Sequence, residues 1–114
     1  MRELTTGKNL TAGSSTTVYT IPKGCKGIVT FLLLANHSNN TKHITASWFD
    51  HSENTTVDIV AAKSLTSKEI LQFTDIRIVM DEFDEFRCTP EASSNYAVIF
   101  TVEIHQSTAY QNGA

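Results

Sequence analysis

Turn-forming residues recur at short intervals along this chain, and the runs between them are too short for most helices. Thr16–Ile21 ends at the tight turn Pro22–Gly24, and Gly27–Ala35 ends at a polar turn over residues 36–40. In His43–Asp50 hydrophobic and polar side chains alternate, which is the period of a strand with one buried face. This spacing predicts an all-β domain with no long helix.

Further runs of the same kind follow later in the chain. They are Thr56–Ala62, Lys68–Phe73, Arg77–Met80, Phe86–Thr89 and Asn95–His105. Together with the first three runs they predict seven to eight short strands. In the first of them Val57, Ile59 and Ala61 are expected on one face. Ser67 could instead cap a short helix through Phe73, because the residues between them are reasonable helix formers, but a strand is the preferred prediction.

The expected architecture is a single β-sandwich, jelly-roll-like or Ig-like, with a small barrel as the alternative. A length of 114 residues suits one domain. Gly27–Ala35 is hydrophobic on both faces, which is typical of a central strand that is covered on both sides. The core is expected to draw its other rows from Ile44–Trp48 and Val98–Ile104. Periodicity leaves the order of the strands open.

The two ends of the chain lack this alternation. Residues 1–15 are polar and contain two glycines, and residues 107–114 have the same character. We therefore expect a flexible N-terminal arm (1–15) and a flexible C-terminal tail (107–114) around a sandwich domain (16–106). Either end could stay disordered or become ordered on a neighbouring subunit. Leu4 and Leu10 are candidate assembly contacts that could anchor such an arm.

The formal net charge of −3 lacks the basic surface that binds nucleic acid. No hydrophobic run approaches the roughly 20 residues that cross a membrane, and the N-terminus has no hydrophobic stretch typical of a secretory signal. Synthesis in a cytoplasm is therefore expected. In that reducing compartment Cys25 and Cys88 are expected as free thiols, although a disulfide between them is possible.

No residue pattern points to catalysis, a metal or a cofactor. His37, His43 and His51 lie close in sequence but lack the spacing of metal ligands. The acidic cluster Asp81–Glu85 lacks the alternating ligands and the glycine of a calcium loop, so a solvated turn is expected there. Lysines flank Cys25, but no histidine is tied to it. The chain is therefore predicted not to be an enzyme.

Two adjacent aromatic residues are candidates for recognition. Trp48 lies on the hydrophobic row of its strand and is expected in the core. Phe49 points to the opposite face and is a candidate assembly contact. A competing hypothesis is a carbohydrate-binding module for host attachment, which would use Trp48 or Phe49 with the turns around His37 and His51.

Short motifs occur in a characteristic order. Val18–Gly24 reads VYTIPKG, and Gly27–Asn36 reads GIVTFLLLAN. A polar turn, the run ITAS and Asp50 follow, and near the end an acidic segment precedes a hydrophobic strand that finishes in Glu-Ile. This order resembles small β-sandwich virion structural proteins of tailed bacteriophages. Here Phe83 stands where that class usually has a glycine before an aspartate.

The resemblance implies a β-sandwich subunit present in many copies in a virion, after synthesis in the host cytoplasm. It would be a capsid decoration or cement protein, or a neck or tail accessory protein. Its expected partners are copies of itself and other virion proteins, with neither nucleic acid nor membrane. The resemblance implies no catalytic residues.

Overall fold

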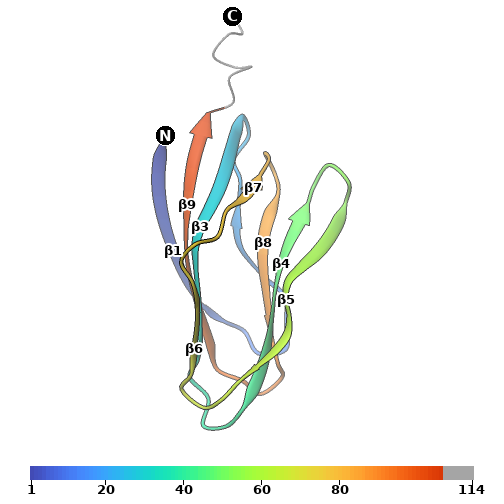
Figure 1. The fold of residues 1–114 in the computed structure, drawn as a ribbon. Coiled ribbons are helices and arrows are strands. Elements are labelled where there is room, and N and C mark those ends of the chain that lie inside the picture. The colour runs from blue at the N-terminus through green and yellow to red at the C-terminus, as the bar shows by residue number, and fades with distance from the viewer. Residues whose placement is uncertain (107–114) are drawn as a thin grey trace, which may run out of the picture.

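A computed structural model describes residues 1–106, which form an all-β sandwich of two antiparallel sheets (Figure 1). The strands are β1 (Arg2–Leu10), β2 (Thr16–Thr20), β3 (Cys25–Asn36), β4 (Lys42–Asp50), β5 (Thr55–Leu65), β6 (Ile70–Phe73), β7 (Ile78–Met80), β8 (Glu85–Pro90) and β9 (Tyr96–Gln106). The predicted fold class is confirmed, and the segment with the helix alternative forms β6. Nowhere in residues 1–106 is there a helix long and hydrophobic enough to cross a membrane.

The strand order is that of a jelly roll. One sheet has the order β1-β9-β3-β6, with β7 also paired to β3, and the other has the order β2-β8-β4-β5. β6 pairs with Leu32–Ala35 of β3, and β7 pairs with Gly27–Val29, so the two short strands occupy one interrupted position. Counted in this way, eight strand positions are divided four and four between the sheets, as in other double-sheet jelly rolls. The topology therefore selects the jelly roll over the Ig-like alternative.

The core lies between the two sheets and comes from the strands that the periodicity singled out. Its fully buried side chains, all under 2% exposed, are Tyr96, Phe86, Phe100, Ile21, Leu32, Leu34, Ile44, Leu65, Met80, Val29, Val98 and Val102. The rings of Phe86 and Phe100 stack across the sheets with centroids 5.1 Å apart. The predicted rows from β3, β4 and β9 are thus confirmed as core.

The N-terminal residues differ from the expectation of a flexible arm. Arg2–Leu10 forms β1 and pairs antiparallel with β9 along its whole length. Leu10 is buried in the core, and Leu4 packs against it. An edge strand can be ordered by backbone hydrogen bonds to its neighbour and needs few hydrophobic side chains. For this reason the polar composition of residues 2–10 did not indicate a strand. The predicted C-terminal tail (107–114) lies outside the described residues.

β5 also differs from a regular strand. It pairs with β4 through two register shifts, and Ala62 within it has φ of 45°. Because such bulges break strict alternation, Val60 and Leu65 enter the core, while Val57 and Ile59 are exposed. Val57 lies opposite Trp48 and Val60 opposite Ala46, so the regular alternation expected for Val57, Ile59 and Ala61 does not hold across the bulges.

The integration of β1 can be tested by substitutions within that strand. Leu10→Ala should lower the free energy of unfolding by about 2–5 kcal/mol, because it removes a buried side chain. Lys8→Ala, at an exposed position of the same strand, should change it by no more than about 0.5 kcal/mol. Urea unfolding followed by circular dichroism measures both. Equal, negligible effects would mean that β1 is detached from the sandwich in solution.

Candidate assembly surface

The outer face of the β1-β9-β3-β6 sheet is hydrophobic. Inward residues of β3 and β9, such as Leu32 and Phe100, fill the core, so their neighbours in sequence point outward. Leu33 of β3 lies opposite Ile99 of β9 on one side and Gln72 of β6 on the other. The outward residues together form a surface that we call the apolar face: Ile28, Phe31, Leu33, Ala35, Ile70, Gln72, Val79, Ala97, Ile99 and Thr101.

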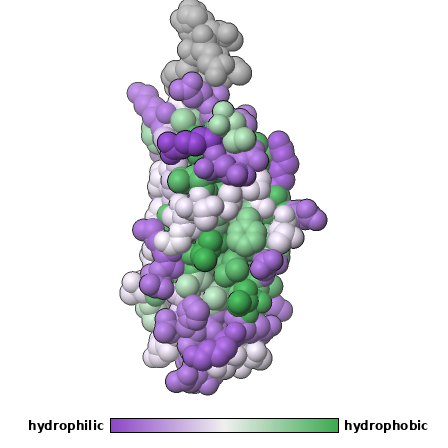
Figure 2. All heavy atoms as spheres, turned by 90° about the vertical axis from the view of Figure 1, so that its left-hand side faces the viewer, coloured by the Kyte–Doolittle hydropathy of each residue, from purple (hydrophilic) through white to green (hydrophobic). Residues whose placement is uncertain are grey.

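None of the residues of the apolar face carries a charge. Three of its side chains are exposed large hydrophobics: Ile70 is 57% exposed, Ile99 41% and Val79 40%. Figure 2 shows the continuous hydrophobic area in the middle of this side of the molecule, between hydrophilic ends. Contiguous exposed hydrophobic surface is typical of interaction sites. The central strand predicted to be covered on both sides is therefore covered on one side only within the subunit.

The outer face of the β2-β8-β4-β5 sheet carries paired polar side chains around Phe49, and Val57 and Ile59 of β5 are also exposed. Glu85 accepts hydrogen bonds from Thr17 Oγ1 and Arg87 Nε, both at 2.8 Å. The bond from Arg87 holds the pKa of Glu85 below its usual value. Beside them, Ser47 donates to Asp58 at 2.8 Å. These polar groups are paired within the subunit, so the two outer faces of the sandwich differ in chemistry.

The three predicted assembly contacts lie at different places. Leu4 and Leu10 face the core from β1 and are part of the subunit's own packing. Phe49 does face outward from β4, as predicted, and the Arg87 guanidinium carbon lies 4.1 Å from its ring centroid. A role for Phe49 in assembly stays a prediction. Sequence reasoning missed Ile70, Val79 and Ile99, although the two-sided hydrophobicity of Gly27–Ala35 was a signal for that face.

The acidic cluster contains a structural carboxylate. Asp84 is only 1% exposed and accepts hydrogen bonds from Trp48 Nε1 (3.0 Å) and from the backbone N–H groups of His51 (2.9 Å) and Asp81 (2.9 Å). The expectation of a solvated turn is therefore wrong for Asp84. The adjoining Phe83 has φ of 69°, a left-handed conformation that suits the glycine usual in the resembling class.

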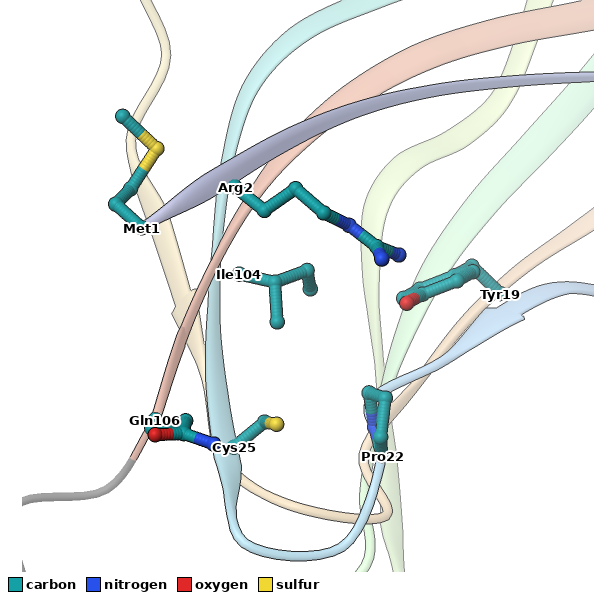
Figure 3. A pocket seen from close by; sticks show the side chains of 7 residues that line it. All are labelled: Met1, Arg2, Tyr19, Pro22, Cys25, Ile104 and Gln106. Carbon is teal, nitrogen blue, oxygen red and sulfur yellow. The ribbon is translucent and has the colours of Figure 1, made fainter. Parts of the chain in front are cut away.

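A pocket of about 430 Å³ opens at one end of the sandwich, among β1, β2, β3 and β9 (Figure 3). Its lining residues are Met1, Arg2, Tyr19, Pro22, Cys25, Ile104 and Gln106. The Arg2 side chain extends toward Tyr19. Burial raises the pKa of Tyr19, and the charge of Arg2 partly opposes that rise. Neither histidine nor carboxylate is among these lining residues, so no base accompanies the Cys25 thiol there.

The histidines are dispersed over the surface. His43 lies 3.6 Å from Glu91, His105 lies 3.4 Å from Glu103, and the His51 ring meets Phe83 edge-on at 5.3 Å. Among residues 1–106, no group of three or more His, Cys, Asp or Glu side chains is placed to hold a metal ion.

No family model and no curated protein sequence matches the chain. Solved structures do match it in fold. A chain of the Bacillus endospore appendages, described as a novel family of disulfide-linked pili, has a TM-score of 0.55 at 8% identity, over 93% of this chain and 86% of its own. The infectious bursal disease virus VP2 subviral particle has a TM-score of 0.57 at 10% identity, over 99% of this chain.

The T13 viral particle of that virus also matches, with a TM-score of 0.50 at 9% identity over 93% of this chain. Our chain spans about a third of the two viral chains, 34% and 35% of their lengths. At these identities the likeness shows the fold alone. The chain is thus a jelly-roll β-sandwich whose architecture also occurs in a pilus subunit and a viral particle protein.

Asp84→Ala should lower the free energy of unfolding by about 3 kcal/mol or more, because it leaves three donors without their acceptor. Asp84→Asn keeps one acceptor oxygen and should cost less. Asp81→Ala, at an exposed side chain, is the matched control and should cost no more than about 0.5 kcal/mol. Urea unfolding followed by the fluorescence of Trp48, the single tryptophan, reports all three. A loss for Asp84→Ala no larger than that of the control would contradict the structural role.

The two thiols should differ in reactivity. Both cysteines are free, and burial raises the pKa of Cys88 to about 12, so Cys88 stays an inaccessible neutral thiol in the folded chain. Cys25 faces the end pocket. At about pH 8, a chromogenic aromatic disulfide should therefore modify one thiol in the native protein and the second only in urea. Cys25→Ser should abolish the native reaction; equal native rates for both thiols would refute this.

Proposed function

We propose that this chain is a structural subunit of a virus particle, of the kind carried by tailed bacteriophages, and that it acts by packing rather than by catalysis. The observation that carries the proposal is the apolar face. A subunit that worked alone in water would be expected to present polar side chains there, as β8 does on the opposite sheet with Glu85 and Arg87. A subunit surrounded by neighbours would bury this face on assembly.

Two further observations support the proposal. The order of the VYTIPKG, GIVTFLLLAN and C-terminal motifs resembles small bacteriophage virion proteins. The fold is shared with a protein described as a viral subviral particle and with one described as forming disulfide-linked pili. Within a particle, the subunit would be a capsid decoration or cement protein, or a neck or tail accessory protein. Its partners would be copies of itself and other virion proteins.

The carbohydrate-binding alternative gains no support from the two aromatic residues on which it depends. Trp48 packs against the core, and its indole N–H is donated to Asp84. Phe49 has Arg87 over its ring. Stacking on a sugar needs an open aromatic face, and Arg87 already occupies one face of the Phe49 ring.

The proposal predicts that the chain is an abundant component of particles. Particles prepared from the biological source of the chain and purified on a density gradient should contain many copies, as counted by quantitative mass spectrometry against the major capsid protein. Incorporation of Ile99→Lys should fall at least about tenfold, since a charge would be buried against a hydrophobic partner. Thr56→Lys, on the other sheet, should be incorporated normally. Absence of the chain from intact particles would overturn the proposed function.

A further inference from the structure

We infer that the pocket at the end of the sandwich binds a small organic acid, whose carboxylate is held by Arg2 and Tyr19. The inference goes beyond the proposed function and does not depend on it. It is carried by the position of Arg2 in the sheet, by the donors that meet in the pocket, and by the size and walls of the cavity.

Arg2 stands on the inward row of its sheet, at the end of the core. It lies opposite Ile104, two residues before Leu4, which lies opposite the buried Val102. Because side chains alternate along a strand, Arg2 points to the same side as these core residues. Glu3, the next residue, points to the outer face. A guanidinium therefore lines the inside of the sandwich at this end, whereas the neighbouring carboxylate does not.

The pocket begins where the core ends. Ile21 is fully buried and fills the space over Gly27, where a Cβ would collide with the Ile21 side chain. Gly27 pairs with Ile104, in the row of Arg2, so the packed core reaches this row. Cys25 lies two residues before Gly27, one row further out, and lines a pocket of about 430 Å³ instead of a packed layer.

Two hydrogen-bond donors meet in this pocket without an acceptor. The Arg2 side chain extends toward Tyr19, and the Cys25 sulfur points into the same space (Figure 3). Within residues 1–106 Arg2 takes part in no ion pair, and the Tyr19 hydroxyl makes no hydrogen bond. Burial raises the pKa of Tyr19, so its hydroxyl keeps the proton that it would donate.

The lining residues favour a monoanion with a hydrophobic part. Arg2 carries the single charged side chain among them, so it neutralises one carboxylate, whereas a phosphate dianion would keep an unpaired charge. A guanidinium binds both carboxylate oxygens side by side, and a tyrosine hydroxyl can donate to one of them. Met1, Pro22 and Ile104 form nonpolar walls. The volume of about 430 Å³ is at the small end of ligand pockets, which suits a small molecule.

The exposure of Arg2 sets the expected affinity. Arg2 is exposed, and an ion pair in contact with water contributes little to binding. Most of the affinity must therefore come from burying the hydrophobic part of the ligand against the nonpolar walls. For phenylacetate, with about ten non-hydrogen atoms, we expect a dissociation constant on the order of 1–10 mM.

Protection of Cys25 from alkylation measures this binding in the full chain. At about pH 8, phenylacetate at about 20 mM should slow the reaction of Cys25 with iodoacetamide at least about threefold, whereas the uncharged phenylacetamide should slow it less than about 1.5-fold. Sodium chloride keeps the ionic strength equal, and mass spectrometry of the peptide that contains Cys25 gives the rates. Equal protection by both compounds, or no protection by phenylacetate, would overturn the inference.

Variants test which residues hold the carboxylate. Arg2→Gln should abolish the protection, and Lys8→Gln, which removes the same charge from the same strand about 20 Å away, should retain it. Tyr19→Phe should weaken binding about two- to tenfold, because one donor is lost. Circular dichroism should show that all three variants are folded. Protection that survives Arg2→Gln, or that Lys8→Gln removes equally, would contradict the assignment of this pocket.

Discussion

The antiparallel pairing of β3 with β9 is the interaction on which the rest of the structure depends. The two strands pair from Cys25 and Gln106 at one end to Asn36 and Tyr96 at the other, and β1, β6 and β7 attach to their outer edges. Inward side chains of this pair form the centre of the core, and outward side chains form the apolar face. Neighbours in sequence therefore have different roles: Phe100 stabilises the subunit, while Ile99 is available to a partner.

Buried polar side chains hold the two ends of the sandwich. At one end the Asn36 amide nitrogen lies within 3.1 Å of the carbonyl oxygens of Asn40, Leu65 and Thr66, and its oxygen accepts from Ser38 N–H. At the other end Asp84 joins three segments in the same way. A buried polar group is costly unless it is paired, so each satisfied group favours one loop conformation over others. These hydrogen bonds connect the loops at each end of the sandwich.

The two outer faces of the sandwich differ in whether their side chains are paired within the subunit. Glu85, Arg87 and Asp58 are paired with neighbouring side chains on the outer face of the four-stranded sheet. The five-stranded sheet has no comparable network, and burying its side chains would release free energy only when a neighbour arrives. Under the proposed function, symmetry would repeat each such contact over a particle.

Local alternation of hydrophobic and polar residues was enough to predict the all-β class, the approximate positions of most strands and the core rows around Leu34, Ile44 and Val98. That information is local, because a strand exposes its side chains with a period of two wherever it lies. Three features depended on tertiary structure: the place of β1, the jelly-roll order and the burial of Asp84. β1 is ordered by backbone hydrogen bonds to β9, and Asp84 by donors from β4 and the following turn. Both partners are distant in sequence, and no periodicity within a segment records which distant segment will lie beside it.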